Sequence, residues 1–257
     1  MKKRWIIAGA LLAVVAAGVV AIWPEAKEIY EMKKQERQLR NLETEVVRIE
    51  LAGQHFNIPM RYLYGQAIEK HRQWPKAKKE RVKVDALTLS VLLPDMRPYY
   101  PEDDAKWKVR GHGDRVEVTI MKFRGPPKNW GKRNEINIDL IEKFISEGRF
   151  YKRSMDVYDL IHYTDANKQP YNNGDIYFAR DREMRIDCDA INPPSSDWKG
   201  FYSPSCKVAT DHSPGIVLEY YYGINHLPSW REIDDGLKSM FDKLSRAAQS
   251  ESTNKEE

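Results

Sequence analysis

The stretch CKVATDHSPGIVLEYYY, residues 206–222, decides the fold class because it holds two strand-like runs separated by a polar turn. Residues 206–210 and 216–222 are rich in β-branched, apolar and aromatic side chains, which favour strands. Residues 211–215 read DHSPG, a composition typical of turns. The stretch therefore predicts two strands of a sheet-based domain.

Further strands are expected on the N-terminal side of this stretch, because runs of similar composition recur there. They are residues 46–51, 82–93, 107–110, 115–123, 155–163, 175–179 and 184–190. The turn 111–114 between two of these runs predicts a hairpin. Helices are expected at 137–148 and 229–244, the second opened by a capping box of Ser229 and Glu232. We predict an α+β fold with a mainly antiparallel sheet and flanking helices, in which two strand-rich halves permit a loose duplication.

An apolar run, residues 5–23 (WIIAGALLAVVAAGVVAIW), follows three basic residues at positions 2–4. As a helix it would extend roughly 28 Å, close to the bilayer's hydrocarbon thickness of about 30 Å. The positive flank is expected to stay in the cytoplasm, so the rest of the chain faces outward. A cleaved secretory signal is the alternative, but the apolar core of such signals usually spans about 7–15 residues. We expect a retained anchor in the bacterial inner membrane.

The chain is expected to contain five parts, of which one is a large exported domain. They are a cytoplasmic N-terminus (1–4), a transmembrane anchor (5–23), a charged helical stalk (24–45), a periplasmic α+β domain (46–247) and a disordered polar tail (248–257). The formal charge is +4, but 39 Lys and Arg face 38 Asp and Glu once positions 2–4 are set aside. This balance gives no support to a nucleic-acid partner.

The only two cysteines, Cys188 and Cys206, both lie on the exported side. An oxidising compartment such as the periplasm permits a disulfide between them. Metal ligation is the alternative, but neither a CxxC nor an HxxxH motif accompanies them. We predict a disulfide, no metal and no cofactor.

Catalytic signatures are missing from the sequence, which contains no GxSxG, Walker-type, HExxH or Gly-rich dinucleotide motif. Asp211, His212 and Ser213 are the residue types of a hydrolase triad, but neighbours in sequence do not point at one another. We interpret them as a polar turn. The chain is therefore expected not to be an enzyme.

Three segments combine aromatic side chains with Lys or Arg, the residue types that dominate protein interfaces. Their candidate contact residues are Arg72, Trp74, Lys78 and Arg81; Lys128, Trp130 and Arg133; and Trp198, Phe201 and Tyr202. The third segment lies between the cysteines, and a disulfide-braced loop loses less entropy on binding. The alternative is that these loops are simply solvated.

Four short motifs resemble small membrane-anchored or periplasmic proteins of Gram-negative bacteria, some of them immunity proteins encoded beside type VI secretion effectors. The motifs are AGQHFNIPMRYLYG (52–65), RIDCDAIN (185–192), PSCKV (204–208) and LPSWREIDDGLKSMFDKL (227–244). The resemblance implies a protein that binds and neutralises a toxin, often a phospholipase or cell-wall hydrolase. It carries over no binding residue, because contact residues vary with the toxin. An envelope hydrolase or an accessory protein of an envelope complex is the alternative.

Overall fold

The computed structural model describes residues 27–30, 33, 45–64, 80–125, 131–148, 151–165, 174–191 and 200–253. The chain separates into two compact units, Met1–Glu45 and Val46–Glu257. Within the first unit, residues 27–30 and Lys33 are helical. The predicted anchor, 5–23, lies outside the described residues. Among those that are described, no helix combines the length and the apolar character needed to cross a bilayer.

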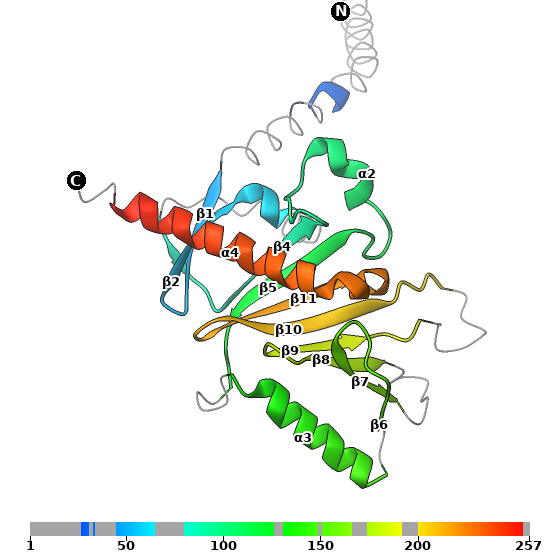
Figure 1. The fold of residues 1–257 in the computed structure, drawn as a ribbon. Helices are drawn as coiled ribbons and strands as arrows, with labels where there is room; N and C mark the ends of the chain where they lie inside the picture. The colour runs from blue at the N-terminus through cyan, green and yellow to red at the C-terminus, as the bar shows by residue number, and fades with distance from the viewer. Residues whose placement is uncertain are drawn as a thin grey trace, which may run out of the picture. The chain divides into compact units, whose positions relative to one another are not determined.

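The second unit contains a small sheet of three strands (Figure 1). Its order is β2 (Gln54–Pro59), β1 (Val46–Leu51) and β3 (Val82–Lys83). β1 and β2 pair antiparallel, whereas β3 runs parallel to β1. The alternating side chains Ile49, Leu51, Phe56 and Ile58 are buried, so one face of this sheet belongs to the core.

The larger sheet has eight strands in the order β4-β5-β11-β10-β9-β8-β7-β6, and every neighbouring pair is antiparallel. The strands are β4 (Ala86–Leu92), β5 (Arg115–Lys122), β6 (Tyr151–Arg153), β7 (Leu160–Asp165), β8 (Asp175–Ala179), β9 (Met184–Cys188), β10 (Ser205–Ser213) and β11 (Ile216–Gly223). The predicted antiparallel α+β fold is confirmed. All strands from β4 onward form one sheet. The permitted division into two similar halves stays a prediction.

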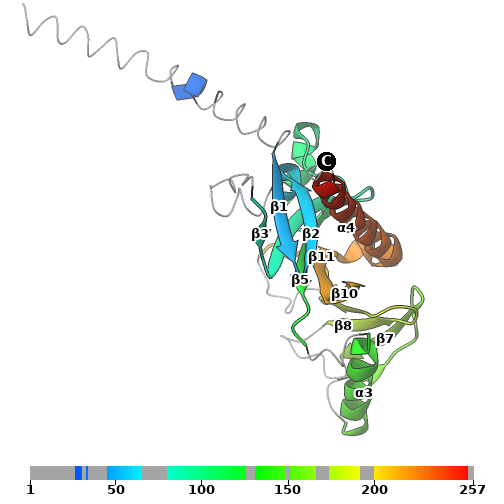
Figure 2. The same cartoon turned by 90° about the vertical axis from the view of Figure 1, so that its left-hand side faces the viewer.

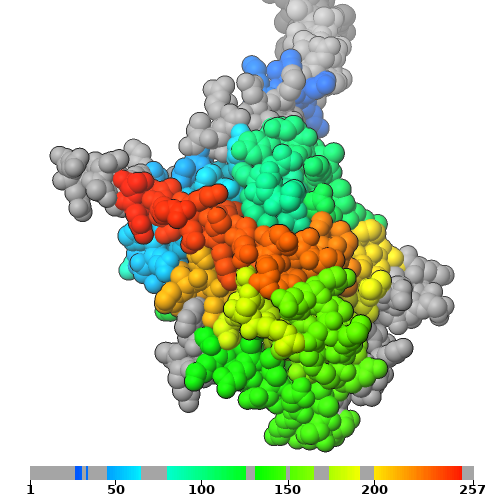
Figure 3. All heavy atoms as spheres, viewed as in Figure 1, coloured from blue at the N-terminus to red at the C-terminus, as the bar shows by residue number. Residues whose placement is uncertain are grey.

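Helix α4 (Trp230–Thr253) crosses one face of the large sheet and reaches β2 (Figures 1, 2 and 3). Its predicted apolar face is buried throughout, at Trp230, Ile233, Leu237, Met240, Phe241 and Leu244. Phe241 meets Phe56 of β2 edge to face, with ring centroids 6.4 Å apart. One amphipathic helix therefore packs against both sheets.

The remaining helices lie at the periphery of the unit. Helix α3 (Arg133–Ser146) packs Ile141 against Tyr163 and Phe178 in a separate small cluster. α2 (Asp104–Trp107) follows the 3₁₀ turn η2 (Pro101–Asp103). Two further 3₁₀ turns are η1 (Met60–Leu63) and η4 (Ile224–Ser229), the second leading directly into α4.

The predicted hairpin of 107–110 with 115–123 is wrong. Trp107 is the last residue of α2, and β5 pairs with β4 and β11 instead. Pro101 at the first position of η2 favours a helical start, and the buried Trp107 ring packs edge to face on Tyr99 and Tyr64. This tertiary aromatic cluster overrides the local strand preference.

Several predicted boundaries also differ from the structure. Asp211, His212 and Ser213 were interpreted as a polar turn, but they belong to β10, which continues through Ser213. The strand expected at 155–163 begins only at Leu160, because Tyr158 and Asp159 adopt positive φ in a turn. The run 82–93 divides into β3 and β4. Helix α4 continues through Thr253, although a disordered tail was expected from 248.

Burial of His212 makes the stability of this fold pH-dependent. Its side chain is 4% exposed at the end of β10, beside Phe241 of α4. Burial lowers its pKa below the usual 6.5, with Lys238 acting in the same direction and Asp242 and Asp234 opposing. The folded protein therefore binds the proton less well than the unfolded chain does.

We expect the free energy of unfolding to fall as the pH drops below about 6.5, where unfolded His212 takes up a proton. His212→Asn should flatten this dependence between about pH 7 and 5. A residual slope should remain, because burial also lowers the pKa of His112. Urea unfolding at several pH values measures the effect, and His55→Asn at an exposed position is the control. Equal slopes for wild type and His212→Asn would contradict the assignment.

Candidate functional site

The predicted disulfide between Cys188 and Cys206 is present and joins two neighbouring strands. Cys188 ends β9, Cys206 lies near the start of β10, and the two are direct partners in the antiparallel register. Both side chains are buried. The bridge therefore fixes both ends of the connection between β9 and β10.

Hydrogen bonds extend this bracing beyond the bridge. The Asp189 carboxylate accepts bonds from the backbone N–H and the hydroxyl of Ser205, both at 2.9 Å. The Tyr202 hydroxyl donates to the Ala190 carbonyl. The Ile224 N–H donates to the Pro204 carbonyl at 3.1 Å, which ties the connection to the end of β11. Hydrogen bonds of Asp189, Tyr202 and Ile224 therefore hold the described ends of this loop in place.

The turn after α2 lies directly against this connection. Gly111 has a φ of 86°, and a β-carbon there would lie 2.3 Å from the Ser203 hydroxyl oxygen. Only glycine permits this approach. The contact places the guanidinium of Arg110 over the Phe201 ring, 4.3 Å from its centroid. His226 supports the turn through a hydrogen bond between its Nε2 and the Gly113 carbonyl at 3.0 Å, and the Asp114 carboxylate lies 3.3 Å from the same nitrogen.

Four exposed residues on these two loops form what we call the disulfide-end patch: Val109, Arg110, Ile191 and Phe201. Val109, Ile191 and Phe201 are large apolar side chains that are 48%, 74% and 47% exposed. The exposed Lys106 and Lys108 precede the patch in sequence. Aromatic, aliphatic and cationic groups on a rigid base suit protein recognition better than small-molecule chemistry.

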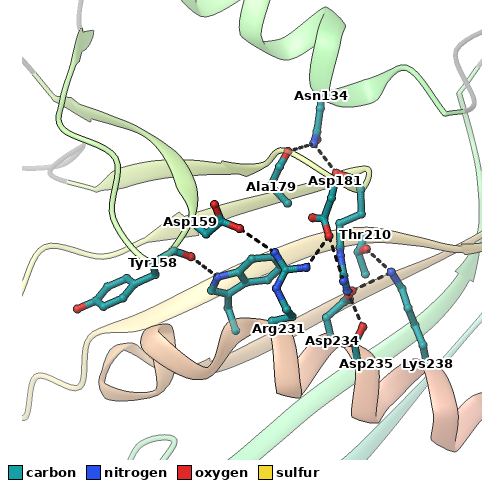
Figure 4. A network of polar contacts seen from close by, with 12 residues as sticks. Asn134, Tyr158, Asp159, Ala179, Asp181, Thr210, Arg231, Asp234, Asp235 and Lys238 are labelled. Atoms are coloured by element: carbon teal, nitrogen blue, oxygen red, sulfur yellow. Dashed lines mark hydrogen bonds and ion pairs between the residues drawn. The ribbon is translucent and has the colours of Figure 1, made fainter.

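A second polar cluster lies where α4 meets the turn between β8 and β9 (Figure 4). The Asp234 carboxylate is fully buried and accepts bonds from Arg182 at 2.7 Å, Lys238 at 2.8 Å and Tyr220 at 3.2 Å. Arg231 donates to Asp181 and Asp159, and the Trp230 indole donates to the Tyr158 carbonyl. Each charge in the cluster therefore has an opposite partner.

This cluster fixes the helix rather than offering reactive groups. The hydrogen bond from Arg231 and the charge of Arg182 lower the pKa of Asp181. Burial, assisted by Asp234, raises the pKa of Tyr220 well above 10, which keeps the hydroxyl protonated as a donor. Within the described ranges, no group of three or more His, Cys, Asp or Glu is arranged to hold a metal ion.

Four of the predicted contact residues are described, and they fall in three separate places. Phe201 belongs to the disulfide-end patch, with Tyr202 bonded beneath it to Ala190. The Arg81 guanidinium donates to the carbonyls of Ile49 and Phe56 and to the Asn57 side chain, in the small sheet. Arg133 pairs with Asp211 at the start of α3. The other six, Arg72, Trp74, Lys78, Lys128, Trp130 and Trp198, lie outside the described residues.

Sequence reasoning missed Val109, Arg110 and Ile191. Residues 107–110 were predicted as a strand, which hid the exposure of Val109 and Arg110. The pairing of Arg110 with Phe201 joins positions far apart in sequence and leaves no local pattern. The glycine-rich run 111–114 was the available signal, because a close backbone approach is one reason for glycine.

The disulfide should contribute measurable stability. In the chain-entropy model, a loop of this length stabilises the folded state by about 3 kcal/mol. The double variant Cys188→Ser/Cys206→Ser should therefore unfold at lower urea, with the free energy of unfolding reduced by about that amount. Unchanged stability would show that the hydrogen bonds at Asp189 and Tyr202 brace the loop on their own.

Asp234 should contribute far more to the free energy of unfolding than its neighbour Asp235. Asp235 also accepts a hydrogen bond from Arg182, but its side chain is 58% exposed. Removing one partner of a buried pair costs about 3–5 kcal/mol, whereas exposed pairs contribute about 1 kcal/mol or less. Asp234→Asn should lower the free energy of unfolding strongly and Asp235→Asn weakly. Equal losses in urea titrations would contradict the role given to Asp234.

No protein-family model matches the sequence, and no curated protein matches it either. Two solved structures share the fold. FrpD, an iron-regulated outer membrane lipoprotein of Neisseria meningitidis, matches at a TM-score of 0.51 and 15% identity, over 80% of this chain and 95% of FrpD. Smlt3025, an immunity protein of the Stenotrophomonas maltophilia type IV secretion system, matches at 0.51 and 16%, over 78% and 93%. This chain therefore shares its fold with both proteins. The immunity protein among them belongs to a type IV secretion system, whereas the sequence motifs resembled immunity proteins of type VI systems.

Proposed function

We propose that this chain is an exported immunity protein, not an enzyme, that binds a secreted antibacterial effector and blocks its active site. The observation that carries the proposal is the shared fold with an immunity protein, found over most of both chains. The Cys188–Cys206 bridge supports export, because disulfides persist in oxidising compartments such as the periplasm.

The disulfide-end patch is the contact surface in this proposal. Arg110 is held over Phe201 on a braced loop, so it loses little freedom when a partner binds. A fitting partner presents an apolar hollow bordered by carboxylates. Cell-wall glycosidases carry paired carboxylates in their clefts, so an effector of this class matches the patch in charge. Inhibition follows from occlusion of that cleft.

Membrane attachment belongs to the same proposal. Residues 5–23 would hold the domain on the outer side of the inner membrane, as a single-pass protein. Tethering raises the effective concentration of the inhibitor where an effector acting in the periplasm arrives. The chain with its anchor would therefore protect better than the same chain released from the membrane.

An envelope accessory protein is the second candidate, favoured by the shared fold with FrpD, an outer membrane lipoprotein. In that case the patch would bind a resident envelope protein rather than an incoming effector. Loss of the chain would then change the envelope in every culture, with or without attacking neighbours.

Contact-dependent competition tests the proposal directly. A strain lacking this chain together with its effector gene should be killed by its parent on a solid surface. Expression of the full chain should restore survival. Survival of the deletion strain beside its parent would favour the accessory role. An envelope defect of the deletion strain grown without its parent would favour it too.

Patch variants should lose protection in the same assay. Arg110→Glu combined with Phe201→Ala should weaken effector binding by about 2 kcal/mol or more, roughly 30-fold, because such residues are typical hot spots. Arg246→Glu changes an exposed charge of α4 and serves as the matched control. Calorimetry with the effector that the competition reveals gives the affinity. An equal loss of effector affinity in both variants, or no loss in either, would show that the effector does not bind through the disulfide-end patch.

A further inference from the structure

Helix α3 carries an apolar stripe on the side that it does not pack against the sheet. Ile141 is buried, and Ile138 and Ile145 pack on the small cluster beneath the helix. Ile136 and Leu140 do not belong to this cluster, and their side chains are 44% and 46% exposed. At a spacing of four residues they are neighbours on one helix face. Figures 1 and 2 show α3 at the edge of the domain, where a partner can reach it.

Charges at the two ends of this stripe have opposite sign. Lys132 precedes α3, Glu147 follows it, and both are exposed, as is Lys143. Positions 136, 140 and 143 share one face of α3, because their spacings are four and three, and the capping residues 132 and 147 lie one such spacing beyond each end. The stripe therefore begins with the cation Lys132, has an apolar centre, and ends with Lys143 followed by the acid Glu147.

A stripe of this kind is complementary to itself when reversed. Two antiparallel copies centred near Leu140 bring the two Leu140 side chains together. Lys132 then faces the partner's Glu147, and Ile136 packs along the aliphatic stem of the partner's Lys143. Such an isologous contact satisfies the two-fold symmetry of a dimer. We propose that α3 pairs with α3 of a second copy of this chain to form a weak antiparallel dimer.

The helix length sets the expected strength. Fourteen residues give roughly 21 Å of helix, and one such face buries less than the about 1,200 Å² at the lower end of stable interfaces. Association should therefore depend on concentration. The dimer uses α3, whereas the effector contact proposed above uses the loops around Gly111 and Phe201. A failure of one proposal therefore does not affect the other.

Cysteine cross-linking tests the pairing, because both natural cysteines are already in the disulfide. In Leu140→Cys the only free thiol lies on the proposed two-fold axis. The full chain, purified in detergent and mildly oxidised, should form a disulfide dimer on a non-reducing gel. Ser146→Cys is exposed on the same helix, but its symmetry mate would lie roughly 20 Å away, so it should stay monomeric. No dimer at 140, or equal dimer at both positions, would overturn the proposal.

Sedimentation of the full chain without an added thiol gives an independent answer. The wild type should show a reversible monomer–dimer equilibrium at protein concentrations below about 0.5 mM. Leu140→Glu should abolish the dimer while the far-ultraviolet circular dichroism stays unchanged, and Arg246→Glu should leave the dimer intact. Higher salt should weaken the wild-type dimer by screening the Lys132–Glu147 pairs. A monomer at every concentration would overturn the proposal.

Discussion

The packing of α4 across two sheets is the interaction on which the rest of the domain depends. Phe241 meets Phe56 of the small sheet, while Tyr220 of the large sheet bonds to Asp234 of the same helix. Without the helix, the apolar faces of both sheets would be open to water. The satisfied charges around Asp234 fix where the helix sits, since a buried carboxylate is tolerated only when its partners are in place.

The large sheet, fixed by α4, is a rigid support for the loops at its edge. The disulfide and the bonds of Asp189 hold the connection between β9 and β10, and Gly111 lets the turn after α2 approach it closely. Binding to a braced surface costs little conformational entropy. The same scaffold can therefore present different side chains on its loops, which fits the binding role proposed above.

Much of this architecture could be predicted from local patterns. The strands from β8 to β11 follow from composition, the apolar face of α4 follows from its helical periodicity, and the disulfide follows from the cysteine count. The patch could not be predicted in the same way. Trp107 packs on Tyr64 and Tyr99, and Arg110 stacks on Phe201, so both features depend on residues distant in sequence.

Hydrogen exchange tests the central claim most directly, by comparing the full chain alone with the chain bound to the effector that the competition identifies. We predict slower exchange at 108–114 and 200–205, the loops that carry the patch, with little change along α4. Protection confined to other regions, or no stable complex with that effector, would contradict an immunity protein that binds through its disulfide-braced edge.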